Sequence, residues 1–183
     1  MKSKLLALLL PAVASPLFAA PLQLDVYNPR ENAIFPVSST LVSGPTEAIL
    51  FDAQFSTKDG EKLVEMIKSR GKTLKAIVIT SGDPDFYFGL QPIVKAFPDA
   101  KVLATPQVVE HIRATKEAKL QYWGPQMKEG APTALTVPQA TTETRFRIDG
   151  ETLELRHPSD YAAYVWVPAN RTILGGTGVA SGI

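Results

Sequence analysis

Residues 77–90 of the chain read Ile-Val-Ile-Thr-Ser-Gly-Asp-Pro-Asp-Phe-Tyr-Phe-Gly-Leu. The β-branched run Ile77–Thr80 is typical of a buried strand. Residues 82–85 predict a polar loop directly after it, because glycine, aspartate and proline disfavour continuation of a strand. Binding residues concentrate in loops at strand ends. Pro84 fixes the backbone between two carboxylates, so both can face one cation or one polar ligand; alternatively, these aspartates cap a helix that begins near Tyr87.

The segments before this stretch predict an α/β arrangement. Glu47–Ala53 is almost continuously apolar, which is typical of a strand covered on both faces. Ser56–Arg70 has the pattern of an amphipathic helix that Gly71 ends. Because this helix joins Glu47–Ala53 to Leu74–Thr80, the two strands are expected to be parallel neighbours with a right-handed crossover. The loop after Thr80 then lies at the carboxyl ends of the strands, where open α/β sheets bind ligands.

The segments after it predict two more helices and a second sheet. Leu90–Phe97 is expected to be a short helix, and a longer helix is expected from Pro106 to about Leu120. His111 in that helix is interpreted as a solvated residue, and Tyr122–Pro125 as an aromatic loop that packs under a helix end or lines a pocket. The other predicted strands are Leu22–Tyr27, Ile34–Val42, Lys101–Thr105, Ala134–Val137, Thr144–Ile148, Thr152–Arg156, Tyr161–Val167 and Thr172–Leu174, with a two-residue hairpin turn at Asp149-Gly150.

The N-terminus has the pattern of a secretory signal peptide. Lys2 and Lys4 precede an apolar run, Leu5–Phe18, that ends in small residues. This apolar run is shorter than a typical membrane-spanning helix. Pro11 and Pro16 disfavour the alternative of a buried N-terminal helix. Because of this N-terminal pattern, residues 1–19 are predicted to be removed, which leaves one domain, residues 20–183, in the periplasm or outside the cell.

The composition limits the class of protein. The chain has no cysteine, so it has no lipid attachment site and no disulfide framework. Its 19 basic and 18 acidic residues give a net charge of +1, which does not favour nucleic acid as a partner. The expected partner is a small-molecule substrate or ligand, and no membrane span is expected in the mature chain.

The strand, loop and helix of residues 77–90 resemble the metallo-β-lactamase superfamily. Its signature, His-x-His-x-Asp-His, lies in the same kind of loop. Aligned with that signature, Ser81 and Asp83 stand at the first two His positions, Asp85 at the Asp and Phe86 at the last His. The resemblance implies an αββα sandwich, while the residue pattern alone also fits a plain α+β domain.

Two further segments resemble parts of the same family. His157 stands where the family supplies another metal-binding His, and Gly176 stands where the family has an Asp that bridges two metals. Asp52 is at the place of an Asp that supports the metal loop from behind, although it also fits a simple polar strand end. In the family, more helices, a strand and a final His would follow Ile183, so the resemblance implies that the C-terminal part of the domain is missing.

The resemblance implies a mononuclear metal site at most. Asp83, Asp85 and His157 are the predicted ligands of one divalent metal, either zinc or iron or manganese, and the alternative is no metal at all. Asp85 is the predicted catalytic residue, which would orient or deprotonate water during hydrolysis of a small ester or amide. The other functional hypothesis is an inactive periplasmic binding or interaction domain, or a truncated relic.

Two other hypotheses follow from single residues. Ser81 as a nucleophile would need His157 as its base and Asp160 as orienter, but no Gly-x-Ser-x-Gly elbow surrounds it. If the closing segment is absent, an apolar sheet face that includes Tyr164, Trp166 and Ile173 predicts self-association.

Overall fold

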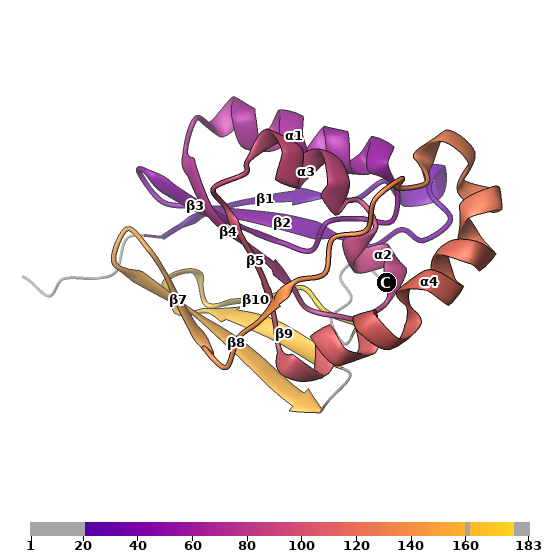
Figure 1. Cartoon of the computed structure of the whole chain (residues 1–183). Helices are drawn as coiled ribbons and strands as arrows, with labels where there is room; N and C mark the ends of the chain where they lie inside the picture. The colour runs from indigo at the N-terminus through magenta and orange to yellow at the C-terminus, as the bar shows by residue number, and fades with distance from the viewer. Residues whose placement is uncertain (1–20, 160–161, 178–183) are drawn as a thin grey trace, which may run out of the picture.

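The computed structural model describes residues 21–159 and 162–177, so the predicted signal peptide and Asp160 lie outside the described residues. Two sheets lie face to face (Figure 1). The six-stranded sheet contains β1 (Gln23–Tyr27), β2 (Ser39–Ser43), β3 (Glu47–Phe51), β4 (Thr73–Ile79), β5 (Lys101–Ala104) and β6 (Gln139–Ala140), in that order. The four-stranded sheet has the order β10 (Thr172–Leu174), β9 (Ala162–Val167), β8 (Glu151–Ser159) and β7 (Arg145–Ile148).

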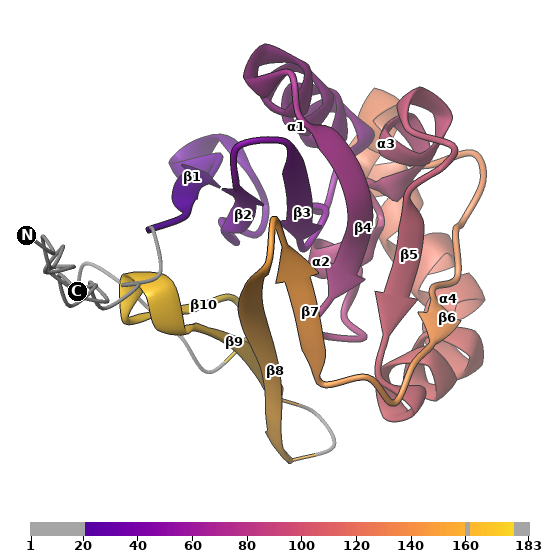
Figure 2. The same ribbon diagram turned by 90° about the vertical axis from the view of Figure 1, so that its left-hand side faces the viewer.

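The described helices lie on one side of the six-stranded sheet, and the second sheet lies on the other (Figure 2). These helices are α1 (Thr57–Arg70), α2 (Pro84–Tyr87), α3 (Leu90–Ala96) and α4 (Pro106–Met127). The described residues also contain the short 3-10 turns η1 (Arg30–Asn32), η2 (Lys128–Gly130) and η3 (Pro168–Asn170). None of the helices in the described residues is long and apolar enough to cross a membrane.

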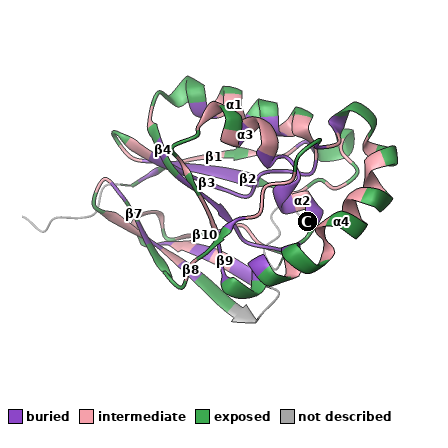
Figure 3. Cartoon of the chain, viewed as in Figure 1, coloured by how far each residue is buried: buried purple, intermediate pink, exposed green. Residues whose placement is uncertain are grey.

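Two apolar clusters follow from this layering. The first, around Leu50, Ile77 and Ile93, lies between the sheet and the helices. The second, around Val78 and Val165, lies between the two sheets. Figure 3 shows buried stretches in the strands of both sheets and, on one side of the six-stranded sheet, helices with exposed outer faces. Strands β3 and β4 supply both clusters, which explains why their sequences are apolar throughout.

Most of the predicted elements are confirmed. The Ser56 hydroxyl caps α1 by accepting a hydrogen bond from the Asp59 amide, and Gly71 ends the helix with a φ of 62°. Strands β3 and β4 are parallel neighbours. Asp149 and Gly150 form the turn between β7 and β8, both with positive φ.

Three boundaries were predicted wrongly. Tyr122–Pro125 is not a loop but the last part of α4, which runs to Met127 with Pro125 inside it. Residues 134–137 form no strand, and β6 begins only at Gln139. Strand β2 begins at Ser39 rather than Ile34, because the chain before it turns toward the helices and places Phe35 against Phe55, with ring centroids 5.1 Å apart.

The outer face of the four-stranded sheet is not covered by any helix of the described residues (Figure 1). Tyr164 and Trp166 on β9 are half-buried, and Ile173 on β10 is 48% exposed. Self-association through this face stays a prediction.

Candidate functional site

The loop after β4 lies at the carboxyl end of the parallel strands, as predicted. Asp83 occupies the N-cap position of α2, but its side chain makes no capping hydrogen bond. Its carboxylate instead accepts a hydrogen bond from the Lys119 ammonium at 2.8 Å. The capping alternative for Asp83 is therefore wrong, since its carboxylate is directed at α4 rather than at the α2 backbone.

Asp52 holds this loop from behind. It is fully buried, and its carboxylate accepts hydrogen bonds from the Thr80 amide at 2.8 Å and the Thr80 hydroxyl at 2.7 Å. The Gly176 backbone, from the segment after β10, also donates to it. Burial raises the pKa of Asp52 to about 7, against the lowering effect of these hydrogen bonds. Asp52 therefore ties β3, β4 and the end of β10 together beneath the loop.

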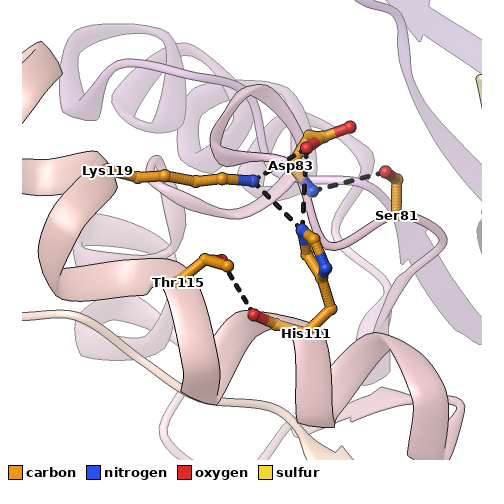
Figure 4. A network of polar contacts seen from close by, with 5 residues as sticks. All are labelled: Ser81, Asp83, His111, Thr115 and Lys119. Carbon is orange, nitrogen blue, oxygen red and sulfur yellow. Dashed lines mark hydrogen bonds and ion pairs between the residues drawn. The ribbon is translucent and has the colours of Figure 1, made fainter.

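Three residues form a polar network above the loop (Figure 4). The Lys119 ammonium lies 2.8 Å from Asp83 Oδ1 and 3.2 Å from His111 Nε2, and His111 Nε2 is 4.0 Å from the same Asp83 oxygen. The His111 ring lies directly against Gly82: a Cβ at that position would be 2.6 Å from His111 Cδ2. Glycine at position 82 therefore permits this close approach of α4.

The interpretation of His111 as a merely solvated residue is wrong for this reason. His111, Thr115 and Lys119 are spaced by four residues, so they lie along one face of α4. That spacing is the signal that could have identified the face. The sequence could not show that the face meets the loop, because the contact depends on how α4 crosses the sheet.

A cleft of about 520 Å³ opens beside the loop. Its walls come from the end of β1, the segment before β2, the loop itself and the chain after β10. The lining residues are Val26, Asn28, Pro36, Val37, Ser38, Thr40, Asp83, Asp85, Phe86, Ile173, Leu174, Gly175, Gly176 and Thr177. The lining is mixed, with apolar side chains such as Val37 and Phe86 beside polar ones such as Asn28 and Thr40. The sequence did not predict the contribution of β1 and β10.

Asp85 is the half-buried carboxylate of this cleft. Partial burial and the negative charge of Asp83 raise its pKa to about 6, while the charge of Lys119 lowers it. A carboxyl group with such a pKa changes its charge close to neutral pH. Asp85 is therefore suited to hold a cation or to accept a proton in the cleft.

His157 lies elsewhere. It is exposed and lines a separate cavity of about 280 Å³ with Thr105, Gln107 and Glu143, and this cavity shares no lining residue with the cleft. Ser81 is 3% exposed, and its hydroxyl accepts a hydrogen bond from the Asp83 amide at 3.3 Å. The structure thus brings Asp83 and Asp85 together but does not add His157 to them.

The fold and the position of this loop can be compared with known proteins. The family model of the metallo-beta-lactamase superfamily matches residues 33–176. The chain belongs to the metallo-beta-lactamase superfamily. No curated protein matches the chain.

Solved metallo-beta-lactamases have the same fold. BLEG-1, a B3 metallo-beta-lactamase, matches with a TM-score of 0.62 and 14% identity, over 82% of this chain and 70% of that one. A metallo-beta-lactamase from Pontibacter korlensis matches with a TM-score of 0.52 and 22% identity, over 80% of this chain and 62% of that one. MEM-A1, a subclass B3 enzyme from a soil metagenome library, matches with a TM-score of 0.52 and 19% identity, over 75% and 54%. At these identities the likeness shows the fold alone.

The residues at the metal positions of the superfamily do not fit the superfamily's zinc set. At the bridging position, Gly176 has a φ of 79°, and a Cβ there would lie 1.8 Å from the Ala163 carbonyl oxygen, so no carboxylate fits. Phe86 offers an apolar ring that is 5% exposed and belongs to the core. Among the residues that the structure describes, no group of three His, Cys, Asp or Glu side chains is placed to hold a metal ion. The predicted ligand roles of Asp83, Asp85 and His157 stay predictions.

Proposed function

We propose that this metallo-beta-lactamase-fold domain binds a small organic cation in the cleft beside residues 81–86, which comprise the loop after β4 and the first residues of α2 and are called the 81–86 loop below. The Asp85 carboxylate is the observation that carries the proposal. It faces a cleft of about 520 Å³, and no side chain among the described residues donates a hydrogen bond to it. Its own backbone amide donates a hydrogen bond to it, and a ligand that brings a positive charge would stabilise this half-buried carboxylate further.

The charge and the walls of the cleft favour a monovalent cation with an apolar part. Asp83 and Asp85 are the charged side chains among the described lining residues, and Asp83 already pairs with Lys119. Val37 and Phe86 are among the apolar lining residues. The volume lies in the range of small-molecule pockets, roughly 300–1,000 Å³. A ligand with an ammonium group on an aromatic or branched body would match both features.

The test uses three probes with one apolar body and different charges: benzylamine, benzyl alcohol and benzoate. Isothermal titration should detect binding of benzylamine only. Asp85→Asn should weaken benzylamine binding about tenfold or more, because it removes the carboxylate charge. Since the pKa of Asp85 is about 6, the affinity for benzylamine should rise as the pH increases through 6.

The matched control is Asp99→Asn, which neutralises an exposed carboxylate outside the cleft. This variant should bind benzylamine as the parent does. Equal binding of benzoate and benzylamine, or an Asp85→Asn variant with unchanged affinity, would reject the proposal.

A second candidate is hydrolysis of a small ester or amide. The observation that favours it is again Asp85, because a carboxylate with a pKa of about 6 can accept a proton from water near neutral pH. Release of p-nitrophenol from p-nitrophenyl acetate, abolished by Asp85→Asn, would support hydrolysis, and a rate that this variant leaves unchanged would reject it. Elemental analysis of protein purified without chelator tests the metal: stoichiometric metal that is lost in Asp83→Ala and His157→Ala would support the predicted mononuclear site.

We also propose that the protein acts in the periplasm or outside the cell. The support is the N-terminal pattern of residues 1–19. Mass spectrometry of the protein recovered from a periplasmic extract should show a chain that lacks these residues, whereas an uncut chain in the cytosol would oppose the proposal.

A further inference from the structure

A lysine ammonium lies beside both Asp83 and His111. The Lys119 ammonium lies 2.8 Å from Asp83 Oδ1, and its side chain is only 23% exposed. The ammonium also contacts His111 Nε2 at 3.2 Å, so a fixed cation is surrounded by a carboxylate and an imidazole. These are ligand types that divalent transition metals prefer.

The position of Lys119 is set by the fold rather than by a flexible surface contact. Lys119 is in the fourth turn of α4, and the same helix is held against the loop by the His111 ring, which touches Gly82. The charge of Lys119 also reaches Asp85, whose pKa it lowers. The ammonium therefore acts on both carboxylates of the loop.

We propose that Lys119 is the built-in counter-ion of the 81–86 loop and determines the specificity of the cleft. By neutralising Asp83, it leaves Asp85 as the net negative charge, which favours a monovalent cation over a divalent one. The specificity part rests on the proposed ligand class, whereas the counter-ion part concerns Asp83 alone. Without the ammonium, the Asp83 carboxylate and the His111 imidazole, 4.0 Å apart, would be two ligands open to a divalent cation that completes its coordination with water.

The test measures binding of Mn²⁺ by isothermal titration and electron paramagnetic resonance, in the purified parent and in Lys119→Met. Methionine keeps the length and apolar stem of lysine without its charge. We expect Lys119→Met to bind Mn²⁺ at least about tenfold more tightly than the parent. Lys119→Gln is the second neutral variant if methionine impairs folding, which circular dichroism will show.

Three variants make the result specific. Lys119→Arg keeps the positive charge and should behave as the parent does. Lys116→Met, on the same helix beside Glu117, is the matched control and should also leave Mn²⁺ binding unchanged. The double variant Lys119→Met with Asp83→Asn should lose the gained affinity.

A parent that binds Mn²⁺ as tightly as Lys119→Met would overturn the proposal, and so would folded neutral variants without any gain. The Mn²⁺ measurement does not depend on benzylamine. A gain of Mn²⁺ binding without benzylamine binding would reject the proposed function but support the role of Lys119, and the reverse result would reject only the role of Lys119.

Discussion

Three aspartates around the loop after β4 are held in three different environments. Asp52 is fully buried under hydrogen bonds from Thr80, Asp83 is paired with Lys119, and Asp85 faces the cleft. The backbone of Asp52 has a φ of 63°, a left-handed conformation that costs about 1 kcal/mol or more for a residue with a side chain. The fold therefore maintains an unfavourable backbone in order to place this carboxylate beneath the loop.

Asp52→Asn should change how stability depends on pH. Because burial raises the pKa of Asp52 to about 7, from an unfolded value near 4, the folded state resists ionisation of this group. The free energy of unfolding should therefore decrease as the pH rises from 4 to 7, by up to about 1.4 kcal/mol per pH unit for one proton. The asparagine side chain of the variant cannot ionise, so chemical denaturation of the variant at several pH values should show a smaller slope.

Asp85 also makes the free energy of unfolding decrease as the pH rises, since its pKa is raised to about 6. The control is therefore Asp85→Asn, which should remove its own share and leave that of Asp52. Identical slopes in the parent and in Asp52→Asn would contradict the buried, protonated state of Asp52.

The sequence predicted the loop residues better than their partners. Asp83 and Asp85 follow directly from the strand-and-loop pattern, because both the break and the carboxylates lie within a few residues. Lys119 is 36 residues away from Asp83, so only the path of α4 brings its ammonium to the loop. His157 was assigned by resemblance to the same site, but β8 directs it into the cavity beside the start of α4.

At the level of elements, α4 is the one that departs most from its sequence pattern. Gly124 and Pro125 should end a helix, yet α4 continues to Met127. The Trp123 ring packs edge-on against Phe35 and Phe55, at centroid distances of 5.1 and 5.8 Å. This aromatic packing favours the helical backbone at residues 122–127 over the loop that local propensity predicts.

Trp123→Ala should therefore destabilise the protein by about 2–3 kcal/mol, because it removes a large, half-buried ring from this cluster. Chemical denaturation measures the loss, and the helical signal in circular dichroism should decrease slightly. Tyr122→Ala is the control: Tyr122 is 66% exposed, so its loss should cost less than about 1 kcal/mol. Equal effects of the two variants would show that Trp123 does not anchor the end of α4.

The helices and strands with strong local signals were predicted well. Helix α1 has a capping serine, an apolar stripe and a terminal glycine, and all three signals agree. The β7–β8 turn has Asp149-Gly150, which suits its positive φ values. Residues 134–137 have an apolar pattern but no neighbouring strand in the described residues, so their pattern reflects packing against the helix-side core rather than a sheet.

At the scale of the whole molecule, the two sheets are joined at their end remote from the cleft. The Asp149 carboxylate, at the tip of the β7–β8 hairpin, accepts hydrogen bonds from the Thr46 and Glu47 amides at 2.9 Å each, and the Glu47 carboxylate accepts one from the Asp149 amide at 2.8 Å. Leu22 and Asn170 form a second two-way connection. Thr46, Glu47 and Leu22 all lie at the end of the first sheet opposite Asp52.

Asp149→Ala should lower the melting temperature by a few degrees, because it removes these hydrogen bonds and places alanine at a φ of 48°. The hydrogen bonds from Thr46 lower the pKa of Asp149. Its contribution is therefore present above the unfolded pKa near 4 and is lost as the pH falls below that value. Thermal melts at pH 7 and pH 3 check this, since the difference between parent and variant should shrink at pH 3.

Because the two-way connections of Asp149 and Asn170 lie at one end, we expect the layers to separate more easily at the other, where the Gly176 backbone donates a hydrogen bond to Asp52. The two layers are thus fixed to each other at the tip of the β7–β8 hairpin, and the cleft lies at the opposite end. A ligand that is too large for the cleft should therefore enter only if one layer tilts about that fixed end. This tilt would break the buried hydrogen bond from the Gly176 backbone to Asp52.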